Sequence, residues 1–381
     1  MKIVYSTSQI YEPGGTERVL CTKANYLADV LGYDIHIVVL DNTKETFFHF
    51  SDKIQIHSLG IIKVKHKPWM IFGSRSRKEY QQKLFHKLDE IQPDITISLF
   101  GLDVEFLYKA KDRSKKIVEF HFSKNYLQHL GTAIPNDKYR FLRKIWMHIL
   151  LKKDAYCASK YKHIVLLTEK DKRLWGGGNK YTVIPNPLSF QPTCQSTLEN
   201  KKIIAVGSYT PQKGFDLLIE AFSLIAKEYP DWSLEIYGSG QDSEFLQNKI
   251  NSLSLHNQVY RRKPEKNIEQ EMAEASIFAF SSRYEGFGLV LTEAMACGLP
   301  CVSFDCECGP NEILKEGYSG FLVPSGNLSL FAEALKELMR NMDLRKKMGS
   351  QALQEVQRFY PENIMPLWID LFKRVKDEDI I

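Results

Sequence analysis

The chain of 381 residues is 44% hydrophobic and 25% charged, which excludes general disorder and, at roughly 100–200 residues per domain, predicts two domains. No uncharged apolar run reaches about 18 residues, so we expect no membrane-spanning helix. The net charge of +5 is mildly basic, and because no recognised nucleic-acid-binding module accompanies it, we expect no nucleic-acid partner.

Strand-like and helix-like segments alternate along the first half of the chain. The first strand is expected at residues 2–7, and a helix at residues 17–31 follows, with apolar residues recurring on one helical face. Further strands are expected at residues 34–40, 54–59, 94–99, 116–122 and 163–168. This alternation predicts βα units around a parallel sheet, in a domain of residues 1–188.

A second series of the same kind follows a polar linker at residues 189–200. Its strands are expected at residues 202–207, 232–238, 276–281 and 300–304. Its helices are expected at residues 215–227, 244–253, 289–297 and 328–339, and two further helices finish the chain. The prediction is an α/β fold with a second domain at residues 189–360, built as two Rossmann-like, doubly wound domains that face a cleft.

Two loops that join an expected strand to an expected helix carry residues suited to binding an anion. Gly14 and Gly15 open the first helix, whose N-terminal amides favour negative charge; the alternative is a turn that needs glycine for its shape. Lys213 lies just before a helix of the second domain, where it would neutralise a phosphate. The alternative for Lys213 is an ordinary solvated lysine.

A third segment, EGFGLVLTE at residues 285–293, is the most informative. It places Glu285 and Glu293 on either side of two glycines, and the amides between them can be directed at a diphosphate or a sugar. Glu293, about one turn into the following helix, can accept hydrogen bonds from a ribose diol. The alternative is a pair of helix-capping carboxylates.

In this order along the chain, the three segments resemble family 4 of the retaining glycosyltransferases with the GT-B fold. The resemblance covers nearly the whole chain. It is densest at residues 202–324, over VGSYTPQKGFDLLIEAF, IYGSG, SSRYEGFGLVLTEAMACGLPCVSFDCECGPNEI and GFLVPSGN. It implies an N-terminal domain that binds the acceptor, a C-terminal domain that binds the donor, and a last segment, residues 361–381, that packs back on the first domain.

The resemblance also implies roles for individual residues. Glu285 would lie beside the donor sugar. His121, which ends a strand of the first domain, would be the active-site histidine near the acceptor; for a lone histidine the alternative is a structural role. Lys213 and Gly15 would meet the diphosphate, and Glu293 the ribose. The implied donor-binding residues are Gly15, Asn186, Lys213, Gly286, Phe287, Gly288, Leu289 and Glu293.

The chain departs from the family at Ser208, where the family has an arginine that pairs with the diphosphate. The change removes one bidentate cation, which Arg283 or Arg262 would have to supply. It also supports a rival interpretation, a catalytically decayed GT-B protein that binds sugar or docks on membranes. A second rival is a GT-B enzyme of another type, such as an epimerase or a phosphorylase, but no convincing site for free phosphate or pyridoxal phosphate is found.

The implied reaction is retaining transfer of a sugar from a nucleotide-diphosphate sugar. UDP-sugar is the expected donor and GDP-mannose the second candidate. The acceptor would be a glycan or lipid-linked molecule of envelope polysaccharide or glycolipid synthesis. Lys213 and the aligned amides would stabilise the charge that grows on the leaving diphosphate. No DxD-like motif follows a strand in a metal-binding context, so we expect metal independence and no cofactor.

The cysteines and the N-terminus favour a cytoplasmic location. The seven cysteines form no CxxC pair, and the start MKIVYSTSQI is typical of a first strand and not of a signal peptide. The spacing of Cys297, Cys301, Cys306 and Cys308 does not match a zinc site, so we expect these residues to be buried as small side chains.

Two basic stretches of the first domain suit an anionic membrane surface. Residues 138–153 carry six Lys or Arg and no acid, together with an apolar helical stripe, and residues 61–80 carry another six. The expected membrane or acceptor face consists of Lys138, Arg140, Arg143, Lys144 and Trp146. The protein would then be peripheral at the inner face of the membrane. The alternative is a core-packed helix with a solvated basic face.

Overall fold

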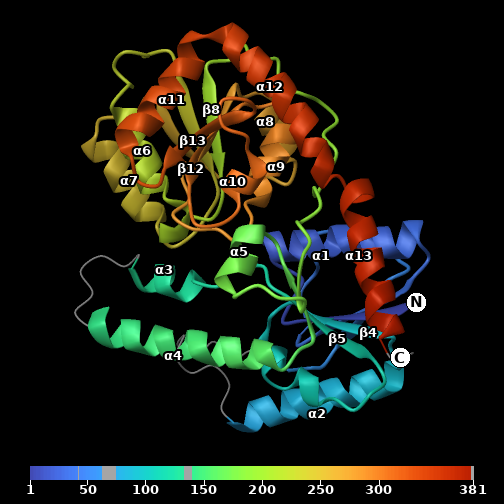
Figure 1. Ribbon diagram of the computed structural model, residues 1–381. Helices are drawn as coiled ribbons and strands as arrows, with labels where there is room; N and C mark the ends of the chain where they lie inside the picture. The colour runs from blue at the N-terminus through green and yellow to red at the C-terminus, as the bar shows by residue number, and fades with distance from the viewer. Residues whose placement is uncertain (42, 62–73, 133–139, 379–381) are drawn as a thin grey trace. The chain divides into compact units, whose positions relative to one another are not determined.

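The computed structural model describes residues 1–41, 43–61, 74–132 and 140–378 (Figure 1). Contacts divide the chain into two compact units. The first consists of residues 1–121, 150–189 and 361–381, and the second of residues 122–149 and 190–360. The chain therefore leaves the first unit twice and returns to it twice. The acceptor-binding and donor-binding roles expected for the two domains stay predictions.

The first unit is built on a seven-stranded parallel sheet in the order β3-β2-β1-β4-β5-β6-β7. The strands are β1 (Lys2–Thr7), β2 (Asp34–Val39), β3 (Gln55–Ser58), β4 (Ile95–Ser98), β5 (Lys115–Glu119), β6 (His163–Leu166) and β7 (Tyr181–Val183). The central strands β1 and β4 are almost wholly buried, polar Ser and Thr residues included, because both faces of a parallel sheet are covered. The strand order reverses between β1 and β4, and ligands of such sheets bind beyond the carboxyl ends of the strands there.

Helices of this unit include α1 (Gly15–Asn25), α2 (Ser74–Ile91), α5 (Glu169–Leu174) and α13 (Pro361–Asp377). A π-helical turn, Tyr26–Val30, extends α1 through most of the helix expected at residues 17–31. Figure 1 shows α13 (red) beside α1 (blue), and the two helices contact each other. Helix α13 buries Trp368, Leu371, Phe372 and Val375. Helices α3 (Tyr126–Thr132) and α4 (Arg140–Ser159) lie in the segment where the chain passes between the units.

The second unit is built on a six-stranded parallel sheet in the order β10-β9-β8-β11-β12-β13. The strands are β8 (Lys202–Val206), β9 (Ser233–Tyr237), β10 (Val259–Arg262), β11 (Ile277–Phe280), β12 (Cys301–Asp305) and β13 (Gly320–Pro324). Strands β10 and β13 were not predicted. The order reverses between β8 and β11, which makes the loops after these two strands the place where a ligand is expected.

Helices cover both faces of the second sheet. Figure 1 shows α6 (Phe215–Ser223), α7 (Ser243–Ser252) and α11 (Leu328–Arg340) on one side. On the other side lie α8 (Ile268–Ala273), α9 (Leu289–Ala296) and α12 (Met342–Val356), with the short α10 (Pro310–Ile313) next to α9. The helix expected to reach residue 227 ends at Ser223 and gives way to hydrogen-bonded turns. None of the described helices is both long enough and apolar enough to cross a bilayer.

Candidate functional site

Two loops of the second unit meet at the point where the strand order reverses. One follows β8 and contains the 3₁₀ turn Pro211–Lys213, and the other follows β11. The amide of Arg283 donates to the Gln212 carbonyl at 2.8 Å, and the Ser281 hydroxyl donates to the Lys213 carbonyl at 2.8 Å. Gly214 has φ of +62°, and a Cβ there would lie 2.2 Å from the Ser281 carbonyl oxygen. Only glycine permits this approach, so the loops are held together before any ligand binds.

Lys213 and Glu285 form an ion pair between these loops. Lys213 Nζ donates to Glu285 Oε1 at 2.6 Å, and the Ser282 hydroxyl donates to the same oxygen at 2.7 Å. The side chains are 20% and 8% exposed. The aliphatic stem of Lys213 crosses Gly207, where a Cβ would lie 3.2–3.3 Å from three of its carbons. The structure thus brings together two residues that the sequence singled out separately.

Residues 286–293 run from the second loop into α9. Gly288 has φ of +101° and immediately precedes Leu289, the first residue of the helix. Phe287 is buried and packs edge-to-face on Phe359, with ring centroids 5.5 Å apart. Glu293, one turn into α9 as expected, is 3% exposed. The N-terminus of α9, with its free backbone N–H groups, therefore follows the segment that carries Glu285 directly in the chain.

Ser208 stands where the family has an arginine, and Arg283 is one of the residues expected to replace that positive charge. Ser208 is exposed in the loop after β8. The guanidinium of Arg283 pairs with Asp216 through two hydrogen bonds, of 2.8 and 2.6 Å, and also donates to the Pro211 carbonyl. These bonds to Asp216 raise the pKa of Arg283. The role expected for Arg283 at a diphosphate stays a prediction, and it would require the guanidinium to be shared with or released from Asp216.

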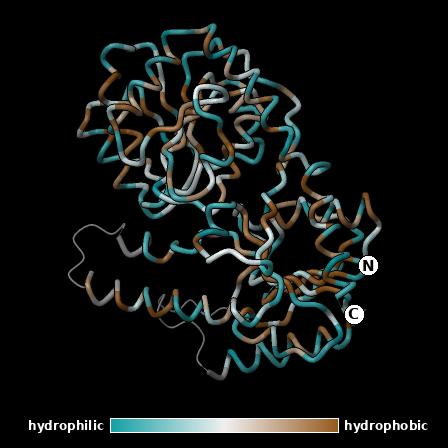
Figure 2. The backbone as a smooth tube through the Cα atoms, viewed as in Figure 1, coloured by the Kyte–Doolittle hydropathy of each residue, from teal (hydrophilic) through white to brown (hydrophobic). Residues whose placement is uncertain are grey.

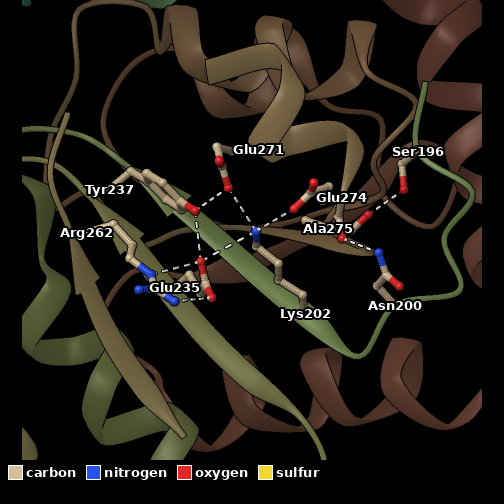
Figure 3. Close-up of polar contacts among 9 residues, drawn as sticks. All are labelled: Ser196, Asn200, Lys202, Glu235, Tyr237, Arg262, Glu271, Glu274 and Ala275. Atoms are coloured by element: carbon tan, nitrogen blue, oxygen red, sulfur yellow. Dashed lines mark hydrogen bonds and ion pairs between the residues drawn. The ribbon is translucent and has the colours of Figure 1, made fainter. Parts of the chain in front are cut away.

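Arg262 ends the edge strand β10 and belongs to a network on one face of the sheet (Figure 3). Its guanidinium donates to both oxygens of Glu235, at 2.9 and 3.2 Å, and Tyr237 donates to Glu235 at 2.8 Å. Glu271 shares the single hydroxyl hydrogen of Tyr237 with Glu235, and it accepts from Lys202 at 3.1 Å. Burial would raise the pKa of Glu235, but these hydrogen bonds and the charge of Lys202 outweigh it and lower that pKa. The network anchors Arg262, whose expected role at the donor stays a prediction.

Three candidate residues lie in the first unit. Gly15 is the first residue of α1, and apart from its chain neighbours and its own helix backbone, no atom of the described residues lies within 4 Å of a Cβ built on it. Asn186 is buried, and its side-chain carbonyl oxygen finds no hydrogen-bond partner in the part of the chain that the structure describes. His121 lies two residues after β5, with 5% of its side chain exposed. Burial lowers the pKa of His121 to about 4, with Glu119 acting against this shift and Lys23 adding to it, so its imidazole is neutral at pH 7.

Comparison with known proteins identifies the family. Residues 194–355 match the family model described as glycosyl transferases group 1. An uncharacterized glycosyltransferase of Haemophilus influenzae is 30% identical over 376 residues, which cover 96% of this chain and 98% of that protein. The chain belongs to the group 1 glycosyltransferases.

Two further comparisons extend this identification of the glycosyltransferase. The amylovoran biosynthesis glycosyltransferase AmsD of Erwinia amylovora is 26% identical over 392 residues, covering 97% of this chain and 99% of AmsD. The crystal structure of a mutant of Staphylococcus aureus TarM, in complex with fondaparinux, alpha-GlcNAc-glycerol and UDP, matches with a TM-score of 0.77 and 15% identity, covering 97% of this chain and 99% of that one. The enzyme therefore has the expected α/β fold of GT-B type with two Rossmann-like domains.

The basic helix of the glycosyltransferase is only partly described. Arg140, Arg143 and Lys144 lie in α4, and Lys138 lies outside the described residues, as do residues 62–73 of the other basic stretch. Figure 2 shows hydrophobic residues recurring along this helix. The exposed large hydrophobic side chains among its described residues are Phe141, Ile145, Trp146, Ile149 and Tyr156. Their exposure does not fit a helix that is packed in a core along its whole length, whereas Cys157 and Ala158 at the end of α4 are buried. The expected membrane or acceptor face stays a prediction.

The cysteines of the enzyme are free thiols. Cys297, Cys301, Cys306 and Cys308 are buried, as expected, and burial raises the pKa of Cys297 to about 12. No cluster of three or more His, Cys, Asp or Glu side chains able to hold a metal ion occurs among residues 1–41, 43–61, 74–132 and 140–378.

Sequence reasoning missed the partners of the glycosyltransferase's predicted site residues. Asp216 binds Arg283, Ser282 binds Glu285, and Glu119 lies beside His121. For Glu119 a signal was present, because it is an acidic residue at the end of a strand expected to be buried. Lys23 gave a similar signal, since it lies on the apolar stripe of the first helix.

Proposed function

We propose that this glycosyltransferase moves a sugar, with retention of anomeric configuration, from a nucleotide-diphosphate sugar to a glycan or lipid-linked acceptor of the cell envelope. UDP-sugar is the expected donor and GDP-mannose the second candidate. The UDP and alpha-GlcNAc-glycerol in the TarM complex and the role of AmsD in amylovoran biosynthesis support these classes of donor and acceptor. The observation that carries the proposal is the Lys213–Glu285 ion pair between the two loops where the second sheet reverses its strand order.

The proposed chemistry follows from this pair. The bond between the anomeric carbon and the diphosphate oxygen breaks, while the acceptor oxygen forms a new bond to the same carbon. Negative charge grows on the leaving diphosphate, where Lys213 and the amides before α9 would stabilise it. The acceptor proton goes to the leaving phosphate in front-face attack. Glu285 would lie beside the sugar and His121 near the acceptor. Because Lys213 would supply the cation, we expect no need for a divalent metal.

Thermal unfolding with nucleotides tests the donor class. At a concentration of about 100 times Kd, UDP is expected to add about 2.7 kcal/mol to the free energy of unfolding, with or without EDTA. GDP, ADP and dTDP serve as competitors in the same assay. Ser208→Arg is expected to tighten UDP binding about tenfold through a charge-assisted hydrogen bond, and Ser208→Gln, which is long but uncharged, should not. A shift that EDTA abolishes, or no shift with any nucleotide, would contradict the proposal.

We also propose that α4 docks on an anionic membrane surface, with Trp146 and its exposed apolar neighbours in the interface and the basic residues of the helix near lipid headgroups. Co-sedimentation is expected with vesicles that contain phosphatidylglycerol and not with pure phosphatidylcholine vesicles. The double variant Ile145→Ser/Trp146→Ser should bind at least about tenfold more weakly. Leu330→Ser, which alters an equally exposed apolar residue of α11, is the control. Equal binding by the double variant would rule out α4 as the docking element.

A further inference from the structure

A buried ion pair lies next to His121 inside the first unit. Lys23 of α1 donates to both carboxylate oxygens of Glu119, at 2.5 Å each, and both side chains are 1% exposed. Lys23 Nζ also lies 4.2 Å from the ring centroid of Trp368 in α13 and 5.6 Å from that of Tyr5 in β1. The ammonium group therefore joins three separate segments of the unit around one carboxylate.

Stability alone does not account for this pair. Removing two charges from water is costly, and apolar residues of similar volume often replace a buried ion pair with no loss of stability. The pair occupies an otherwise apolar face of α1, between the buried residues Leu20 and Ala24. The polar neighbours of the pair include the Tyr5 hydroxyl and the imidazole of His121.

The imidazole of His121 lies beside the carboxylate of the buried ion pair. Its Nε2 atom lies 3.4 Å from Glu119 Oε1 and is buried. Nε2 makes no hydrogen bond to any described residue, so Glu119 acts on the imidazole through its charge at this distance. The charges that act on the imidazole are those of Glu119 and Lys23. The nearby Tyr5 hydroxyl stays neutral because burial, with the charge of Glu119, raises its pKa well above the usual value.

We propose that Lys23 and Glu119 are positioning residues for His121. The negative charge of Glu119, 3.4 Å from Nε2, favours the imidazole proton on that atom, and Lys23 compensates the carboxylate so that the ring does not take up a second proton. His121 then presents a neutral imidazole whose Nδ1 atom accepts a hydrogen bond from the acceptor substrate. This inference rests on the proposed function, which gives His121 its place near the acceptor.

Nitrogen NMR of His121 in the full-length protein tests the inference directly. The wild-type ring is expected to remain the neutral Nε2–H tautomer down to pH 5. Lys23→Met removes a positive charge and leaves Glu119, so it should raise the pKa of His121. Glu119→Gln removes the negative charge that attracts a proton to the ring. It should lower the pKa of His121 below the wild-type value and weaken the preference for the Nε2–H tautomer. Lys23→Arg keeps the charge and should behave as wild type.

Activity gives a second readout. In Lys23→Met, kcat/KM at pH 5 is expected to fall about tenfold below its value at pH 8, against less than about twofold in the wild type. The matched control is Lys116→Met. Lys116 lies on β5, the same strand as Glu119, and its largely buried side chain pairs with Asp112. The variant should leave the pH profile unchanged.

Each result has a defined meaning. Shifts of the His121 pKa in the same direction in Lys23→Met and Glu119→Gln, or no shift in either, would overturn the inference. If Lys23→Met does not fold, the double variant Lys23→Met/Glu119→Gln, which buries no charge, is compared with Glu119→Gln alone. If His121→Asn retains full turnover, the proposed role of His121 fails, whereas the NMR measurements still decide whether the pair sets its protonation.

Discussion

Replacing Lys213 with methionine is expected to reduce kcat for sugar transfer by about 10²–10³-fold. Methionine keeps most of the aliphatic stem that crosses Gly207 but removes the ammonium group paired with Glu285. In the proposed reaction this ammonium meets the diphosphate, where charge grows as the sugar leaves. Steady-state kinetics with a radiolabelled sugar nucleotide would measure the loss, and a larger effect on kcat than on KM would show that the charge acts in the transition state.

The control for this variant is Lys336→Met. Lys336 also forms an ion pair with a glutamate, Glu228, at 2.8 Å, and its side chain is 24% exposed, but it lies on α11 outside the two loops. It should keep full activity. Because Lys213 and Glu285 are one unit, Lys213→Met/Glu285→Gln should be little worse than the more damaging single variant. Full activity in Lys213→Met would remove the central support for the proposed site.

Replacing Gly309 with alanine is expected to lower the free energy of unfolding by about 3 kcal/mol or more and to weaken nucleotide binding at least about tenfold. Gly309 has φ of +96° and ψ of −73°, and a Cβ there would lie 1.8 Å from the Phe287 carbonyl oxygen. Two backbones thus approach each other with no flexible side chain between them. Relief of the clash must displace residues 286–288, the turn before α9. Urea denaturation and nucleotide titration would measure the two effects.

Gly317→Ala separates backbone strain from the clash. Gly317 also has positive φ, +68°, but beyond its two chain neighbours no atom in the part of the chain that the structure describes lies within 4 Å of a Cβ placed on it. The substitution should cost about 1 kcal/mol of unfolding free energy and leave nucleotide affinity unchanged. If the two alanine variants lose equal stability, the approach of Gly309 to Phe287 does not constrain the turn of residues 286–288 before α9.

Several of the elements that sequence patterns predicted have uninterrupted apolar runs. Strands such as β1 and β8 are buried on both faces, and their hydrophobic residues follow one another without interruption. Strand β10 was not predicted because it is a short edge strand in which only Val259 is fully buried and the last two residues are arginines. Strand β13 starts with glycine and ends with proline, and α8 has only six residues. Their conformations depend on neighbours that are distant along the chain.

In the candidate site too, local features were predicted and contacts between distant residues were not. The loops and glycines were predicted because each is a local signal at a strand-to-helix junction. The pairings were not, because Lys213 meets Glu285 across 72 residues and Arg283 meets Asp216 across 67. A spacing rule describes one helix or one turn and carries no information about which side chains of two loops meet. Only the order of strands in the sheet brings those loops together.

The return of α13 to the first unit has a consequence for biosynthesis. Residues 361–377 follow the whole second unit in the sequence, yet Trp368, Phe372 and Val375 are buried in the first unit. A ribosome works from the N-terminus, and domains tend to fold as they emerge. The second sheet, with all its strands between Lys202 and Pro324, has every strand available before that helix is made. The unit that begins first is therefore completed last, and until then the charge of Lys23 lacks its contact with Trp368.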